Sequence, residues 1–140
     1  MLITRASRHD KSDLESFYAK QDWEDPHLND GAAFVAREGS IVGALTLIEV
    51  DPQTIVVEDV LVDPGRRGQG LGTQLIQAAM NSRGGTMFLC CHSERLAFYG
   101  RLGFEDVSFD QLPAGVQQFM RDNDAYPFTA DHVHYFLKAR

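Results

Sequence analysis

Glycines and arginines stand together in one short segment, the run VDPGRRGQGLGTQLIQAAM at residues 62–80. Inside a helix, each of the glycines Gly68, Gly70 and Gly72 would cost roughly 0.5–1 kcal/mol relative to alanine. Without side chains, the loop leaves several backbone N–H groups pointing outward, and both the helix dipole and the two arginines add positive charge there. This combination predicts a cradle for phosphate groups.

Two familiar glycine patterns do not describe this loop. It lacks the Gly-Lys-Ser/Thr ending of a P-loop, and its spacing G-x-G-x-G, followed by Thr73 and Gln74, does not fit the dinucleotide pattern G-x-G-x-x-G. The loop also offers no lysine for a terminal phosphate. We therefore expect a pyrophosphate held mainly by backbone amides, rather than a turn that only links a strand to a helix.

Two separate blocks resemble the GNAT family of N-acetyltransferases. The segment RGQGLG at residues 67–72 resembles the family signature R/Q-x-x-G-x-G/A, whose loop holds the pyrophosphate of acetyl-coenzyme A. The segment ERLAFYGRLGFEDV at residues 94–107 resembles the family's later helix and its F-Y-x-x-x-G-F ending. The resemblance implies one α/β (α+β) domain over residues 1–140. Its mixed central sheet is splayed between the fourth and fifth strands and flanked by helices.

The same resemblance implies where acetyl-coenzyme A binds. Pantetheine pairs with a strand edge through the backbone of Leu61 and Val62, whose side chains belong to the core. His92 stands where many members carry an asparagine that contacts the coenzyme. The pyrophosphate contacts are expected from Arg66, Arg67, Gly68, Gln69, Gly70, Leu71, Gly72 and Thr73.

Acyl transfer to an amine calls for an acid beside the departing sulfur. A thiolate of this kind has a pKa near 8.5, so a proton donor lowers the barrier to collapse of the tetrahedral intermediate. Tyr99 matches the tyrosine that plays this part in many family members. The alternative is that its ring only packs with Phe98 and Phe104.

The attacking ammonium, with a pKa near 10, must also lose a proton, directly or through water. Glu58 is the candidate base, because on a strand it shares a face with Val60 and Val62 and would otherwise be unfavourably buried. Asp59 is expected on the opposite face. Glu49, which also lies late in a central strand, is the alternative base.

The acceptor is predicted only by class. The run that ends in Leu112 and Pro113 resembles a branch with short N-acetylglutamate synthases and amino-acid acetyltransferases, although that branch's later cysteine-proline segment is absent. This favours a primary amine of a small molecule, with amino acids as candidates, and residues 109–127 as a cover for its pocket. Transfer to a protein or peptide amine, and a non-catalytic acyl-coenzyme A module on the same fold, remain alternatives.

Composition and charge indicate the class of protein and the kinds of partner it can bind. With 140 residues and 44% hydrophobic content, the chain is expected to form one globular domain. No apolar run reaches the roughly 18–20 residues of a membrane helix, and the N-terminus is too polar for a signal peptide, so a cytoplasmic protein is expected. The net charge of −7 argues against nucleic acid and favours a cationic amine. A monomer and a homodimer both remain open.

The two cysteines, Cys90 and Cys91, are adjacent on a predicted strand and would point to opposite faces, so we expect buried thiols rather than a disulfide. A cysteine nucleophile served by His92 is the alternative.

No metal site is expected. His132 and His134 share a predicted strand face, and Asp122 and Asp124 could add oxygen ligands, but no further ligand clusters with them at a fitting spacing.

Hydrophobic periodicity and turn residues predict the elements that must position these groups. A helix capped by Asp10 should run to Lys20, with Leu14, Phe17 and Tyr18 on its apolar face. The helix after the glycine loop should bury Leu71, Leu75, Ile76 and Ala79. Strands are expected at residues 2–5, on both sides of a turn at 38–40, at 54–63, 86–91 and 132–138, with an irregular segment at 21–31 and a short helix at 94–101 ended by Gly103.

Overall fold

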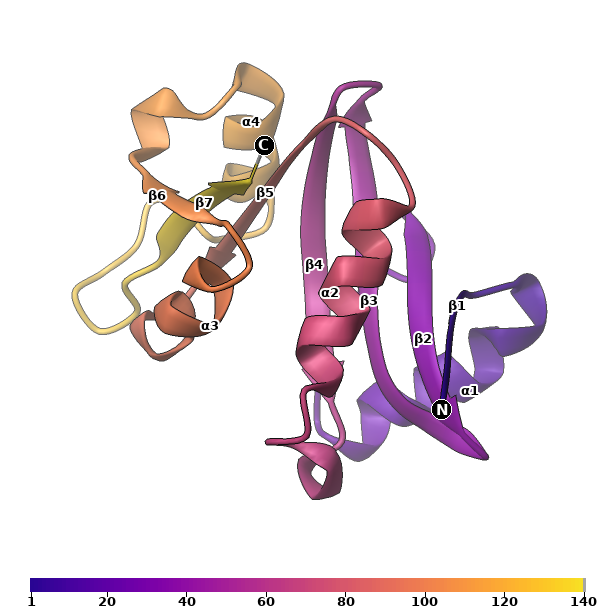
Figure 1. Ribbon diagram of the computed structural model, residues 1–140. Helices are drawn as coiled ribbons and strands as arrows, with labels where there is room; N and C mark the ends of the chain where they lie inside the picture. The colour runs from indigo at the N-terminus through magenta and orange to yellow at the C-terminus, as the bar shows by residue number, and fades with distance from the viewer. Residues whose placement is uncertain (140) are drawn as a thin grey trace. The chain divides into compact units, whose positions relative to one another are not determined.

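The computed structural model describes residues 1–139, in which seven strands form a mixed sheet in the order β1-β2-β3-β4-β5-β7-β6 (Figure 1). The strands β4 and β5 pair in parallel, whereas β1 with β2, β2 with β3, and β7 with both β5 and β6 pair antiparallel. The strands are β1 Leu2–Arg5, β2 Ala32–Glu38, β3 Ser40–Asp51, β4 Thr54–Val62, β5 Thr86–Cys91, β6 Glu105–Val107 and β7 Tyr135–Ala139. The helices are α1 Lys11–Lys20, α2 Leu71–Asn81, α3 Leu96–Gly100 and α4 Ala114–Asp122.

This mixed sheet with flanking helices confirms the predicted α/β fold. The pairs between β4 and β5 run from Thr54 to Val56, whereas β4 continues to Val62. Contacts between backbone segments divide the chain into two compact units, which we describe separately. The first holds residues 1–48 and 57–84, and the second holds residues 49–56 and 85–139.

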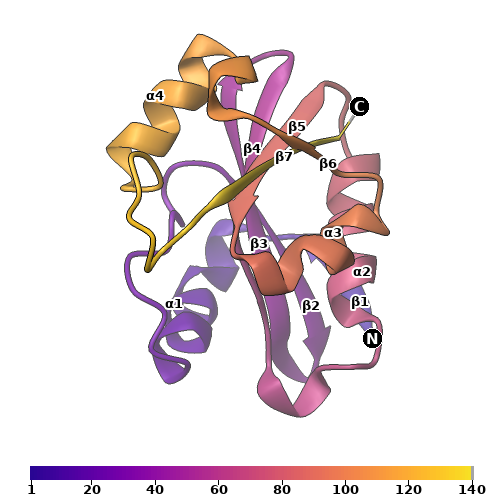
Figure 2. The ribbon, with the colours of Figure 1, turned by 90° about the vertical axis from the view of Figure 1, so that its left-hand side faces the viewer.

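In the first unit, α1 and α2 lie on opposite faces of the strands between them (Figures 1 and 2). Both helices bury the residues that the periodicity predicts. Leu14, Phe17 and Tyr18 of α1 pack in a core with residues of β2, β3 and β4. The buried face of α2 packs closely on β3 at Gly43. A Cβ placed on this glycine would lie only 2.8 Å from Leu75 Cδ1. The buried stripe of α2 consists of Leu71, Leu75, Ile76 and Ala79.

Asp10 occupies the N-cap position of α1 as predicted, but its side chain makes no capping hydrogen bond to that helix. A 3-10 turn at Arg8–Asp10 precedes the helix, and Ser7 caps that turn by accepting the N–H of His9 at 3.2 Å. Asp10 instead reaches back to accept the N–H of Ser7 at 2.8 Å and pairs with Arg37 at 2.7 Å. The Asp10 side chain is therefore the reciprocal partner of Ser7 in the capping box of the 3-10 turn.

In the second unit, β7 lies between β5 and β6 (Figure 2). The strand β6 and the helix α4 were not predicted from the sequence. The closing strand begins at Tyr135, so His132 and His134 precede it and do not share a strand face as predicted. The ladder stops at Tyr135 because its partner strand β5 ends at Cys91, where the chain enters a 3-10 turn at Ser93–Arg95.

None of the helices in residues 1–139 has the length and apolar character needed to cross a membrane.

Candidate active site

The turn that leads from β4 into the glycine loop is fixed by three hydrogen bonds. The N–H of Asp63 donates to the carbonyl of Val42 at 2.8 Å, which ties the turn to β3. The Asp63 carboxylate accepts the N–H of Gly65 at 3.0 Å, and its carbonyl accepts the N–H of Arg66 at 2.8 Å. Together these bonds form the 3-10 turn Pro64–Arg66 and set the direction in which the loop leaves the sheet.

The loop itself has the features that the sequence predicts for a phosphate cradle. Gly68 and Gly70 adopt φ values of +79° and +77°, a region that L side chains rarely adopt, and a Cβ on either residue would meet no atom within 4 Å. Gly70 is the N-cap of α2 and supplies no side-chain cap to its first amides. The space above the glycines is thus open, and the helix start can offer N–H groups to an anion. A pyrophosphate fits these residues.

The two arginines beside the cradle differ in their surroundings. The guanidinium of Arg66 forms an ion pair with Glu38. Arg67 is exposed, its Nε donates to the carbonyl of Val62 at 3.4 Å, and it has no carboxylate partner among residues 1–139. Arg67 is therefore the cation more readily available to a phosphate, whereas Arg66 would first have to leave Glu38.

The other predicted coenzyme contacts divide between core and surface. The side chains of Leu61 and Leu71 are buried, with 6% and 4% of their surface exposed, so these residues can offer only backbone groups. Val62 is half-buried, and it follows the stretch of β4 that pairs with β5. Gln69 is exposed, and Thr73 lies half-buried in the first turn of α2. The structure leaves the coenzyme contacts of these residues as predictions.

Glu58 lies half-buried in β4, in the first unit. Burial raises the pKa of its carboxyl from 4.5 to about 7, and the neighbouring charge of Asp59 acts in the same direction. A carboxyl with such a pKa exists in both protonation states near neutral pH and can both take and release a proton there. These are the properties of a general base, and they agree with the role predicted for Glu58.

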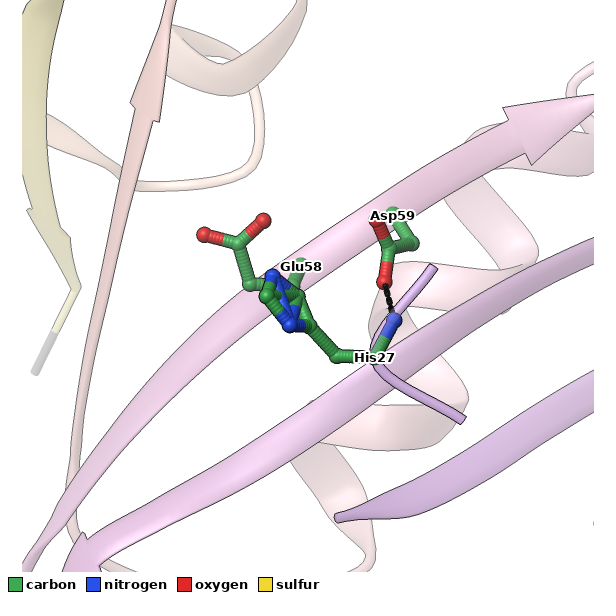
Figure 3. A group of neighbouring side chains, drawn as sticks. All are labelled: His27, Glu58 and Asp59. Atoms are coloured by element: carbon green, nitrogen blue, oxygen red, sulfur yellow. Dashed lines mark hydrogen bonds between the residues drawn. The ribbon is translucent and has the colours of Figure 1, made fainter. Parts of the chain in front are cut away.

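Asp59 has a structural role that the sequence did not reveal. It adopts φ = 57°, a left-handed conformation in the middle of a strand. Its carboxylate accepts the indole N–H of Trp23 at 2.9 Å and the backbone N–H of His27 at 2.7 Å (Figure 3), and its carbonyl accepts the hydroxyl of Tyr18 at 2.6 Å. Asp59 thus anchors the irregular segment at residues 21–31 to β4, directly beside Glu58.

The anchor brings together donor atoms that lie far apart in the sequence. His27, Glu58 and Asp59 each have a ligand-type atom within 4.8 Å of the others, although the two carboxylates point in different directions (Figure 3). Such a donor set could in principle hold a cation. Because both oxygens of Asp59 already accept N–H bonds, we interpret the group as the attachment point of the segment.

Tyr99 belongs to the second unit, in α3. Its ring is buried and packs edge-to-face against Phe98 and Phe104, with centroid distances of 5.0 and 5.7 Å. The helix ends as predicted, with Gly103 at φ = +93°. The Tyr99 ring therefore does pack with Phe98 and Phe104, as the alternative interpretation expects. The role of its hydroxyl as an acid stays a prediction.

The cysteine alternative is disfavoured. Both cysteines are free thiols; Cys91 is buried as predicted, whereas Cys90 is only half-buried. Burial raises the pKa of the Cys91 thiol to about 11, and the charges of Asp106 and Glu94 add to the effect. A thiol with this pKa is almost entirely protonated at neutral pH and is a poor nucleophile.

A family model described as "Acetyltransferase (GNAT) domain" matches residues 29–106. The match includes the glycine loop, Glu58 and Tyr99. The chain belongs to the GNAT acetyltransferase family. Membership of this acetyltransferase family also confirms acetyl-coenzyme A as the co-substrate predicted from the sequence. None of the curated proteins compared with this sequence is a significant match.

Solved structures share the fold of this GNAT protein at low sequence identity. An acetyltransferase of the GNAT family from Staphylococcus aureus Mu50 is 19% identical, with 99% of this chain and 97% of that chain covered and a TM-score of 0.66. Rv2747 from Mycobacterium tuberculosis, in complex with CoA and NLQ, is 18% identical, with 99% and 98% covered and a TM-score of 0.69. N-acetylglutamate synthase from Neisseria gonorrhoeae, complexed with coenzyme A and L-arginine, is 15% identical, with a TM-score of 0.73 over 99% of this chain and 32% of that chain.

Proposed function

We propose that this GNAT protein transfers the acetyl group of acetyl-coenzyme A to a primary amine of a small molecule, with amino acids as the leading candidates. Transfer occurs by direct attack in a ternary complex, and residues 1–140 act as one catalytic domain in the cytoplasm. The observation that carries the proposal is the open, uncapped loop at Gly68 and Gly70, whose amides suit the pyrophosphate of the coenzyme.

In this proposal Glu58 is the base. The amine reaches the site as an ammonium ion and gives a proton to the Glu58 carboxylate, directly or through one water. Its nitrogen lone pair then attacks the thioester carbonyl carbon and forms a C–N bond. Because the pKa of Glu58 is about 7, roughly half of the protein carries the ionised base at neutral pH.

Tyr99 is the proposed acid. When the tetrahedral intermediate collapses, the C–S bond breaks and the electron pair remains on sulfur. A proton from the Tyr99 hydroxyl neutralises this developing thiolate, which makes coenzyme A a better leaving group. The product nitrogen loses its remaining extra proton to solvent, and solvent returns a proton to the tyrosine.

Three observations support a small-molecule amine as the acceptor. The chain carries a net charge of −7, which favours the approach of an ammonium ion. One of its structural neighbours is an N-acetylglutamate synthase, whose name denotes acetylation of an amino acid. The sequence block that ends in Leu112 and Pro113 resembles the same branch.

Thioester turnover tests this proposal. Purified protein and acetyl-coenzyme A are incubated with amino acids, polyamines, aminoglycosides and short peptides, while free thiol is followed by absorbance and products by mass spectrometry. We expect thiol release with at least one small amine, at a rate proportional to protein. Turnover with peptides alone would support the protein N-acetyltransferase alternative. Coenzyme binding without turnover on any amine would support the non-catalytic module.

The base is tested on the best acceptor found. Glu58→Gln should lower kcat/KM at pH 7 and recover part of it by pH 9, where more of the amine is free. Glu49→Gln is the matched control, because it removes the alternative carboxylate. If the Glu49 variant loses activity and the Glu58 variant keeps the parent pH profile, the two assignments must be exchanged.

A further inference from the structure

The pairing of β5 with β7 brings two histidines face to face in the second unit. The last pair in the antiparallel register is Cys91 with Tyr135. His92 follows the first of these residues and His134 precedes the second, so both lie just beyond the end of the ladder. Their ring centroids are 4.9 Å apart, and the ring planes meet at 44°. The sheet register therefore holds the two imidazoles side by side.

The hydrogen bonds of the two rings fix their tautomers. Nδ1 of His92 lies 3.2 Å from the carbonyl of Val133, and Nδ1 of His134 lies 2.9 Å from the carbonyl of Ala125. A carbonyl oxygen can only accept a hydrogen bond, so each Nδ1 must carry the proton. In the neutral rings the lone pair is therefore on Nε2. Neither Nε2 has a hydrogen-bond partner within the described part of the chain.

An imidazole whose Nδ1–H donates to a backbone carbonyl is the form in which histidine commonly ligates a metal through Nε2. The carbonyl bond fixes the ring and increases the basicity of the ligating nitrogen. Here two such rings come from the residues just beyond the last pair of one sheet ladder. Phe128 also packs edge-to-face against His134, with centroids 6.0 Å apart, and further restricts that ring.

We propose that Nε2 of His92 and Nε2 of His134 bind a divalent transition-metal ion that prefers imidazole ligands, namely Cu²⁺, Ni²⁺ or Zn²⁺. Two protein ligands leave the remaining coordination positions to water, so the site is open and the ion exchangeable. The order of affinities for divalent ions predicts that Cu²⁺ binds more tightly than Ni²⁺ or Zn²⁺. No proton-transfer step is assigned to either histidine, and His92 is also the predicted coenzyme contact.

Copper binding tests the proposal on the complete chain. Cu²⁺ is titrated by calorimetry, and the bound ion is examined by electron paramagnetic resonance. We expect one tight site per chain, with hyperfine structure from two equivalent nitrogens. His92→Ala and His134→Ala should each weaken binding at least tenfold and leave at most one coupled nitrogen. His132→Ala is the matched control, because it removes an exposed neighbouring histidine outside the pair, and it should bind like the parent.

Other outcomes would overturn the site. An unchanged affinity in both His92→Ala and His134→Ala would do so, and so would loss of binding in His132→Ala. Loss of the tight site in Glu58→Gln would instead assign the ion to the donor group of His27, Glu58 and Asp59. Far-ultraviolet circular dichroism checks that each variant is folded. If an alanine variant unfolds, His92→Gln and His134→Gln repeat the measurement with side chains of similar size.

Discussion

Replacing Glu58 by glutamine should stabilise the folded protein at and above neutral pH. Burial, reinforced by the charge of Asp59, raises the pKa of this carboxyl from 4.5 to about 7. The folded chain therefore binds the proton more tightly than the unfolded chain. As a result, the stability of the parent falls as the pH rises through this interval. By pH 8 this shift in pKa lowers the stability of the parent by about 3 kcal/mol. Glu58→Gln carries no charge at this position and should not show the loss.

Urea unfolding at pH 4, 5, 6, 7 and 8, followed by the fluorescence of Trp23, the single tryptophan, measures this effect. The variant should match the parent within about 0.5 kcal/mol at pH 4, where Glu58 is protonated in the folded protein. At pH 8 the free energy of unfolding of the variant should exceed that of the parent by about 2–3 kcal/mol. Glu15→Gln, on the exposed surface of α1, should show no comparable gain. Equal stabilities of parent and Glu58→Gln at pH 8, or a gain already present at pH 4, would refute the reasoning.

Three further substitutions test other parts of the structure. Coenzyme A at about 100 times its Kd should stabilise the parent by about 2.7 kcal/mol. Gly70→Val should lose most of this gain, because valine strains a residue at φ = +77° and occupies the cradle. Equal thermal shifts in both proteins would contradict the phosphate cradle. Tyr99→Phe should lower kcat by about 10–10³-fold and leave coenzyme affinity within a few-fold, as steady-state kinetics and calorimetry would show; an unchanged kcat would make Tyr99 a packing residue only. Trp23→Phe should cost about 1.5–3 kcal/mol in urea unfolding followed by circular dichroism, because a buried carboxylate loses a donor; a cost below 0.5 kcal/mol, about the scatter of surface substitutions, would show that the anchor contributes little.

Elements with strong periodicity were predictable from the sequence, because their residues face one core. The stripe of Leu71, Leu75 and Ile76 gave the buried face of α2 correctly. By contrast, α4 was missed although Pro113 precedes it and its buried residues Val116 and Met120 lie one helical turn apart, because the segment was interpreted only as a cover for the acceptor pocket. The alternation at residues 132–138 predicted a strand that begins three residues too early, because the partner strand β5 ends at Cys91 and offers no pairing to the residues before Tyr135.

The candidate site was predictable where local chemistry determines it. The open glycines follow from the residue types alone, and the perturbed carboxyl of Glu58 follows from a charge within a β-branched strand. The partners of Asp59 do not, because Trp23 and His27 precede it by 36 and 32 residues. No periodicity connects an irregular segment to a strand at that separation. The left-handed backbone of Asp59 could not be predicted either, because the alternation of side chains used for the prediction holds only for a regular strand.

The Tyr18 hydroxyl, the Trp23 indole and the His27 amide all donate hydrogen bonds to Asp59. The contributions of these three bonds to stability therefore cannot be independent. A double-mutant cycle between Trp23→Phe and Asp59→Asn should give a coupling energy of about 0.5–3 kcal/mol rather than simple additivity. The same convergence makes opening of the segment at residues 21–31 cooperative. Hydrogen exchange at the His27 amide and collisional quenching of Trp23 should therefore report a single opening equilibrium. A carboxylate buried in a strand thus sets the dynamics of a segment distant from it in sequence.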